Sequence, residues 1–187
     1  NRLGTNSLVD IVVFGHRGGQ QMSQWAAKAD WVELPANPEA RARGEIERLQ
    51  TNLGGESSAK IRAEMQSVMM DHVSVFRAES GMKEALARLA QLRVRYQRVE
   101  VQDQSLKLNT ELEEALELGC LLDLAWATTV AALARAESRG AHSREDYPKR
   151  DDANWLKHSM AVLKEDAITL SSRPVTITRF QPQERKY

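Results

Sequence analysis

The chain has 187 residues, enough for one domain or for one domain with an appendage. Its 26 basic and 26 acidic side chains give a formal net charge of zero, which argues against a general nucleic-acid binder, because such proteins need a basic excess to neutralise phosphates. The single cysteine cannot form an internal disulfide, and no uninterrupted run of 18 apolar residues indicates a membrane-spanning helix.

The first segment, NSLVDIVVFGHRGGQQMSQWAAKA, predicts one helix. Asn6 or Ser7 is a typical N-cap, and Asp10 is expected in the first turn. Apolar residues and glycines then recur at spacings of three or four, and we expect the glycines to mark close packing on another element. A buried strand is the alternative for residues 8–14, but the cap and the continuation to Ala27 favour a helix.

A boundary follows at LPANPEARARGE, where two prolines precede a short helix expected over residues 38–50. Two longer amphipathic segments come next. The first begins at Ser57 or Ser58 and places apolar side chains between Ile61 and Phe76 on one stripe. The second repeats the pattern over residues 82–99. Both patterns predict helices that bury one face.

A third helix is predicted from a Thr110 cap, with Glu113 at the capping-box position, to a stop at Gly140. It is apolar around most of its circumference over residues 116–133, so we expect it to lie between neighbours. Three long helices joined by short turns predict a mainly α fold built on an antiparallel three-helix bundle.

The sequence changes character after the third helix. A charged connector is followed by MAVLKEDAITLSSRPVTITRF, which alternates apolar and polar residues and carries turn signals at Glu165–Asp166 and Ser171–Ser172. This pattern predicts short antiparallel strands. We therefore expect three parts: a helix of a preceding domain over residues 1–35, the bundle over 36–140, and the connector with its strands over 141–187.

Arg2 is the first candidate binding residue. Its planar guanidinium suits a carboxylate or phosphate bidentately, and Gly4 lets the backbone approach a flat ligand. The free amides at Ser7 and Leu8 would form an anion-binding helix end. An ordinary surface salt bridge of Arg2 is the alternative, since an arginine near a capped helix is common.

The second candidate cluster is AESRGAHSREDYPKRDDANWLKH, dense in charges of both signs. An acid–base or metal site is one hypothesis, but no HExxH motif or Cys/His pair supports it. The pattern favours a salt-bridged docking surface, with Arg139, His142 and Arg144 as the candidate docking residues. We identify no catalytic residue and no metal ligand in the chain.

Taken together, these stretches resemble the C-terminal part of the flavoprotein subunit of succinate dehydrogenase and fumarate reductase. NRLGTNSL followed by VDIVVFG is similar to the NRLGxNSL(L)D(L)VVFG segment of that family. ESRGAHSRED, with the following PKRDDANWLKH, is similar to its ESRGAHxRxDxPxRDDxxWxKH segment. The resemblance extends to MQSVMMDHVSVFR and PQERKY, and so from the first residue to the last. L-Aspartate oxidases share the ESRG region but usually differ at NRLG, so they fit less well.

The resemblance implies FAD as the cofactor of the full-length protein and succinate or fumarate as its substrate. Arg2 would bind a carboxylate of the dicarboxylate, and Ser7 and Leu8, with Asn6 beside them, would contact the isoalloxazine ring. The family's dinucleotide-binding motif, its flavin-attaching histidine and its proton-transferring arginine all precede NRLG. We therefore expect the chain to be a C-terminal fragment that alone binds neither FAD nor succinate usefully.

The implied parent enzyme oxidises succinate to fumarate by hydride transfer to FAD and passes electrons through an iron–sulfur subunit to quinone. Fumarate reduction is an alternative, because the same motifs serve both directions. An isolated helical interaction module without activity is a second alternative. No nucleic-acid partner is expected. The resemblance implies only indirect membrane attachment through anchor subunits, at the cytoplasmic face of the inner membrane in a prokaryote or the matrix side in a mitochondrion.

Overall fold

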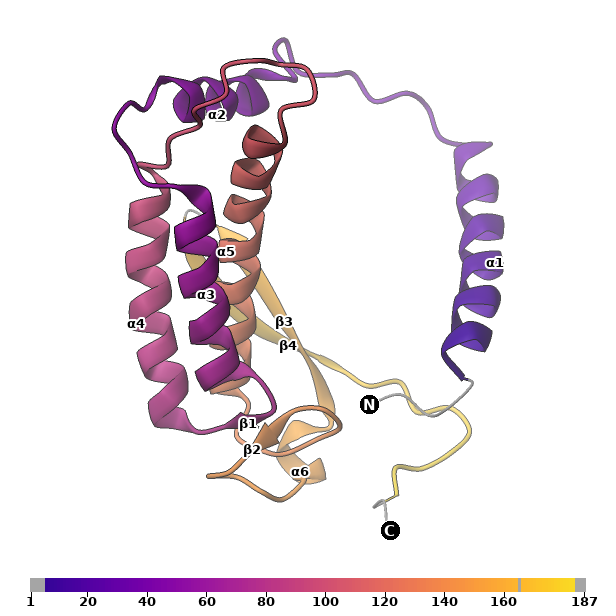
Figure 1. Cartoon of the computed structure of the whole chain (residues 1–187). Coiled ribbons are helices and arrows are strands. Elements are labelled where there is room, and N and C mark those ends of the chain that lie inside the picture. Colours follow the sequence, from indigo (N-terminus) through magenta and orange to yellow (C-terminus); the bar gives the residue numbers. More distant parts are fainter. Residues whose placement is uncertain (1–5, 165, 184–187) are drawn as a thin grey trace. The chain divides into compact units, whose positions relative to one another are not determined.

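The computed structural model describes residues 6–164 and 166–183 of a mainly helical chain (Figure 1). The chain forms two units, residues 1–43 and residues 44–187, which are described separately. The elements are α1 (Asn6–Ala26), α2 (Ala40–Thr51), α3 (Ser58–Val73), β1 (Phe76–Arg77), α4 (Glu79–Tyr96), α5 (Thr110–Ala134), β2 (Ser143–Arg144), α6 (Asp152–Trp155), β3 (Lys157–Lys164) and β4 (Ala167–Pro174).

The predicted first helix is confirmed as α1, which rules out the strand alternative. The helix already includes Asn6, and no acidic residue lies in its first turn, so the expectation for Asp10 is wrong. Within this unit no element packs on the glycines: a Cβ at Gly15 or Gly19 would meet no atom of residues 6–43 within 4 Å, and the apolar side chains over residues 8–14 are exposed there. Close packing of the glycines on an element outside this unit stays a prediction. Glycines at helical spacing favour close packing, but their spacing does not identify the element that packs on them.

In the second unit, α3, α4 and α5 form the predicted antiparallel bundle (Figure 1). Their inward faces carry apolar side chains at helical spacing, and each large one that is removed from water stabilises the fold by about 1.5–3 kcal/mol. The core side chains with at most 1% exposure include Ile61, Val68, Met82, Leu89, Leu118 and Leu122. The short helix α2 adds Leu49 to this core, and the carbonyl of Leu49 accepts a hydrogen bond from the amide of Val101 at 3.2 Å.

The stripe predicted up to Phe76 ends earlier than expected. α3 ends at Val73, where the backbone of Ser74 leaves the helical conformation. Phe76 lies in β1 and is 70% exposed, so its assignment to the buried stripe is wrong. β1 instead pairs in parallel with β2, which places Arg77 opposite Arg144. The apolar spacing in the sequence therefore extends to Phe76, although the helix ends at Val73.

Both ends of α5 differ from the sequence prediction. Asn109, not Thr110, is the N-cap: its side-chain oxygen accepts a hydrogen bond from the amide of Leu112 at 2.8 Å. The helix ends at Ala134 and not near Gly140. The guanidinium of Arg144, and not a glycine turn, satisfies the terminal carbonyls of Ala132 and Leu133. Gly140 has a φ of +60° and belongs to the turn that follows.

α5 contacts α3, α4 and β3, which agrees with its predicted place among neighbours. One side nevertheless stays open, because Leu124 is 62% exposed. By length and composition α5 could cross a membrane, although a central bundle helix meets the same criterion and so this is weak evidence. Asp123 has the partner that its position required, since its carboxylate lies 3.0 Å from the guanidinium of Arg93.

β3 and β4 confirm the predicted antiparallel strands and form a hairpin with Lys164 opposite Ala167. Asp166 has a φ of +64°, which is the left-handed conformation of a tight turn, so the first turn signal is confirmed there. The second signal is wrong, because Ser171 and Ser172 lie inside β4 and pair with β3. Serine also occurs in strands when a partner strand satisfies its backbone groups.

α4 and α5 approach closely at Gly119. A Cβ at this position would lie 2.6 Å from the hydroxyl of Tyr96, which is buried and donates to the carboxylate of Glu45 at 2.8 Å. We expect Gly119→Ala to destabilise the chain by about 1–2 kcal/mol, because overpacking outweighs the gain in helix propensity. Urea denaturation measures the change. Gly44→Ala in α2, where a Cβ meets no atom within 4 Å, is the control. Equal stabilisation by both substitutions would show that Tyr96 moves aside freely.

Candidate functional site

The residues that the family resemblance implies as flavin contacts, Asn6, Ser7 and Leu8, lie at the start of α1. Arg2 lies outside the described residues. Because α1 starts at Asn6, the amides of the first turn, including those of Ser7 and Leu8, have no acceptor within the helix. Ser7 is partly exposed, and Leu8 is 73% exposed. With no acidic side chain in the first turn, the positive end of the helix dipole is not neutralised locally, which favours an anionic group there.

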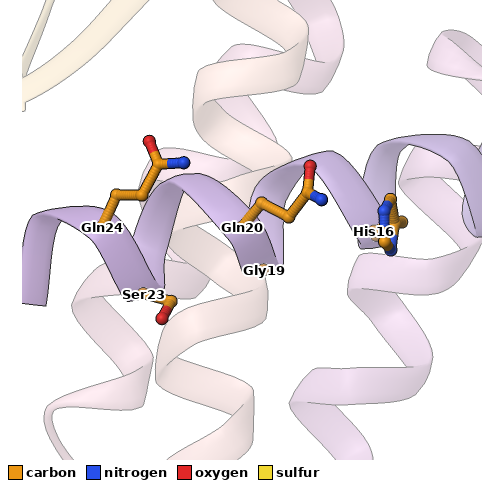
Figure 2. A pocket seen from close by; sticks show the side chains of 6 residues that line it. His16, Gly19, Gln20, Ser23 and Gln24 are labelled. Atoms are coloured by element: carbon orange, nitrogen blue, oxygen red, sulfur yellow. The ribbon is translucent and has the colours of Figure 1, made fainter.

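Farther along α1, a shallow and open depression follows one face of the helix (Figure 2). Its lining residues are Gly15, His16, Gly19, Gln20, Ser23 and Gln24. The glycines leave the backbone bare, and Gln20 and Gln24 project side by side from successive turns (Figure 2). His16 is the one lining residue with an ionisable side chain, so this surface offers no acid–base pair. The GHRGG sequence lies within a helix, as expected, and is not a phosphate loop.

The segment between α5 and β3, residues 135–156, is called the connector from here on; it starts before the boundary at residue 141 that was expected from the sequence. It is organised around Glu137, whose side chain is fully buried. Arg139 donates two hydrogen bonds to its carboxylate, at 2.8 and 2.9 Å, and Arg135 donates a third. The amide of Asp151 donates a fourth at 2.9 Å. Burial raises the pKa of Glu137, but these donors together hold it below its ordinary value. Arg139 also reaches Asp152 at 2.6 Å, so the buried carboxylate is tied into a wider network.

Arg144 joins the ends of two helices and is 1% exposed. Its Nε and Nη2 atoms each donate to one carboxylate oxygen of Asp146 at 2.7 Å. Asp146 in turn accepts from the amide of Glu79 at 2.9 Å, at the N-terminus of α4. The guanidinium beside it lowers the pKa of Asp146 to about 2. The Nη1 atom of Arg144 donates at 3.0–3.2 Å to carbonyls at the C-terminal end of α5, those of Ala132, Leu133 and Arg135.

His142 connects the same loop to a third helix end. Arg77 donates from Nε to the carbonyls of Val73 and Ser74, at 2.9 and 3.1 Å, and so satisfies the C-terminus of α3. Its Nη1 atom lies 2.7 Å from Nδ1 of His142. The other ring nitrogen of His142 lies 3.2 Å from the carbonyl of Arg135. Burial lowers the pKa of His142.

The connector therefore ties α3, α4 and α5 together at one end of the bundle. The three predicted docking residues, Arg139, His142 and Arg144, all have partners within the chain. Arg139 and His142 are partly exposed, so a docking role for them stays a prediction. Sequence reasoning missed Arg77 and Arg135. The signal that could have found them is a basic residue just past the end of a helix, where carbonyls need donors.

Comparison of the chain with known protein families identifies the family to which it belongs. The family profile described as fumarate reductase flavoprotein C-term matches residues 62–187, most of the chain. The chain belongs to the succinate dehydrogenase and fumarate reductase flavoprotein family. This membership confirms the resemblance found in the sequence and the mainly helical fold expected from it.

Members of this flavoprotein family match along the whole chain. The fumarate reductase flavoprotein subunit of Haemophilus influenzae is 40% identical over 100% of the chain and 32% of its own length. The succinate dehydrogenase flavoprotein subunit of Coxiella burnetii is 44% identical over 99% of the chain and 32% of its length. A structure of Escherichia coli quinol fumarate reductase superposes with a TM-score of 0.89 at 39% identity, over 98% of the chain and 32% of that protein. The chain thus spans about a third of the length of these relatives.

Proposed function

We propose that this chain contributes a flavin-contacting helix end and a helical domain to an FAD-dependent enzyme that oxidises succinate to fumarate. The start of α1 carries this proposal. Its first turn carries the free amides of Ser7 and Leu8, the two residues that the family's motif implies for the isoalloxazine ring, and the absence of a carboxylate from that turn supports an anionic ring there. The exposed side chain of Leu8 offers an apolar surface to a flat ring. The described residues therefore fit the cofactor.

Each residue has a distinct role in this proposal. Bound FAD supplies the hydride acceptor. The α1 N-terminus, at Asn6, Ser7 and Leu8, stabilises negative charge on the reduced ring by about 0.3–1 kcal/mol, or about 2 kcal/mol when partly buried. Arg2 holds one carboxylate of succinate through its two-pronged donor set and fixes the orientation of the reacting C–H bond. Its contribution is positioning, because an arginine stays protonated throughout.

The redox reaction of the full-length flavoprotein tests this function. We expect succinate to bleach the absorbance of its oxidised flavin under anaerobic conditions, and fumarate to restore it. Absence of both changes would exclude dicarboxylate chemistry. The chain of 187 residues, purified alone, is expected to be colourless and cooperatively folded. A flavin absorbance band in that sample would contradict the proposal that the chain alone binds no FAD.

Succinate oxidation is the proposed direction, and fumarate reduction is the alternative, since relatives of both names match the chain. The ratio of succinate-dependent dye reduction to fumarate-dependent oxidation of a reduced viologen separates the two. An independent helical interaction module is the third candidate. It would be favoured if the chain folded alone and neither dicarboxylate changed the redox state of the full-length protein.

We also propose that an iron–sulfur subunit takes electrons from the flavin and delivers them to quinone. The name quinol fumarate reductase, which one structural neighbour bears, supports a quinone or quinol as the electron-transfer partner. Anchor subunits would hold the complex at the cytoplasmic face of the inner membrane, or at the matrix side in a mitochondrion. Arg139 and His142, both partly exposed, are the proposed docking residues, with buried Arg144 supporting them from within. Failure of an iron–sulfur subunit to co-purify with the tagged flavoprotein would contradict this assembly.

A further inference from the structure

The imidazole of His142 is held between a cation and a carbonyl. Its Nδ1 atom lies 2.7 Å from Nη1 of Arg77, and its Nε2 atom lies 3.2 Å from the carbonyl oxygen of Arg135. A guanidinium has only N–H donors, so Nδ1 must accept through its lone pair. The carbonyl can only accept, so Nε2 must carry the proton. The two contacts together therefore require a neutral ring with its proton on Nε2.

The surroundings of this ring are predominantly cationic. The charged side chains that act on it are Arg77 on β1, Arg135 just after α5 and Arg144 on β2. In the connector, Glu137 pairs with Arg135 and Arg139, and Asp146 pairs with Arg144. The two carboxylates bond to arginines, and no contact in the described part of the chain joins either one to the ring. Protonation of His142 would turn its acceptor into a donor that faces a donor, and would add a cation among three others.

The contact connects two structural parts. Arg77 satisfies the last carbonyls of α3 with Nε and meets His142 with Nη1, while the backbone of β1 pairs in parallel with β2. The turn at residues 139–142 is closed by two backbone hydrogen bonds between Arg139 and His142, at 2.8 and 3.0 Å, so the position of the ring is fixed by the connector. We propose that the His142–Arg77 contact is an acid-sensitive latch, which holds the end of α3 to the connector and loosens when His142 takes up a proton.

The direction of the pH effect follows from proton linkage. Burial lowers the pKa of His142 in the folded chain, whereas a histidine in an unfolded chain titrates at about 6.5. Above that pH the ring is neutral in both states, and the contribution of the latch is fully present. Below it only the unfolded chain binds the proton, so stability is lost as pH falls toward the folded value. Within this window the unfolding equilibrium constant rises by up to about tenfold per pH unit.

Urea denaturation of the chain between pH 8 and pH 5 tests the latch with two matched substitutions. His142→Gln keeps an acceptor and a donor but does not titrate, and His158→Gln removes an exposed histidine from β3. We expect the wild type and His158→Gln to lose stability steeply below about pH 6.5, and His142→Gln to follow a flatter curve. The same pH dependence in His142→Gln and in the wild type would overturn the proposal.

Nitrogen-15 NMR of the His142 ring in the wild-type chain gives a second test that does not depend on a variant that folds. We expect the neutral tautomer with the proton on Nε2 at pH 7, and a titration midpoint below about 6.5. A proton on Nδ1 at neutral pH, or a midpoint at or above that of an unfolded histidine, would overturn the latch.

Discussion

Replacing Arg144 with methionine is expected to lower the free energy of unfolding by about 3–5 kcal/mol, the usual cost of removing one partner from a buried ion pair. Arg144 is 1% exposed, and its loss leaves Asp146 without both of its 2.7 Å donors. Carbonyls at the C-terminal end of α5 lose their donor at the same time. Methionine fills a similar volume, so the change reports lost polar contacts more than lost packing. Urea denaturation of the chain measures it.

Arg173→Met is the matched control, because Arg173 is an exposed arginine on β4. We expect it to change stability by no more than about 0.5 kcal/mol. A double-mutant cycle with Asp146→Asn should give a coupling energy of about 0.5–3 kcal/mol, since the two side chains act on each other. Equal effects of Arg144→Met and Arg173→Met would contradict a structural role for the buried arginine.

The same substitution changes the acid limb of the stability curve. Arg144 holds the pKa of Asp146 at about 2, below the value of about 3.9 expected in the unfolded chain. This carboxylate therefore contributes stability that is present above about pH 4 and lost as pH falls toward about 2. In Arg144→Met we expect that part of the acid dependence to shrink, because the folded and unfolded pKa values approach each other.

The helices could be predicted because their signals are local. The stripe that includes Ile61 and Val68 in α3 needs no knowledge of distant residues, since helical spacing alone gathers it on one face. Helix ends depend on tertiary contacts as well as on the local pattern. The apolar pattern predicted that the α3 stripe includes Phe76, which lies beyond the end of the helix, and Gly140 predicted an end of α5 that lies six residues beyond Ala134, where the helix ends. The actual end of α5 is satisfied by Arg144, whose position depends on how the connector folds back.

The candidate site shows the same division. The helix start at Asn6 follows from local sequence, while the roles of Arg2, Ser7 and Leu8 came from the family resemblance. The connector motif indicated ion pairs, but the order of its residues does not determine which charged side chains pair with each other. Helices α4 and α5 lie between Arg77 and His142 in the sequence, and the parallel pairing of β1 with β2 brings the two residues together. Contacts of this kind depend on tertiary structure, and local spacing cannot give them.

Replacing Arg2 with alanine in the full-length flavoprotein is expected to lower kcat/KM for succinate by about 100-fold or more, because positioning of the reacting groups is lost. FAD content should stay unchanged, since the proposed flavin contacts are the separate positions Ser7 and Leu8. The kcat/KM of Arg2→Lys should lie between those of the wild type and Arg2→Ala, because a lysine keeps the charge but lacks the planar guanidinium that binds a carboxylate with two donors. Steady-state assays with dye reduction, together with the flavin absorbance spectrum, measure both properties.

Arg17→Ala provides the control, because Arg17 is an exposed arginine farther along α1. A general loss of positive charge near the helix would affect both variants, whereas loss of a substrate contact affects Arg2→Ala alone. The pattern of rate constants adds a further distinction. An arginine that only binds the dicarboxylate raises KM when removed, while one that also aligns the C–H bond with the flavin lowers kcat as well. Unchanged kinetics in Arg2→Ala would remove the substrate assignment and leave the surface salt bridge as the role of Arg2.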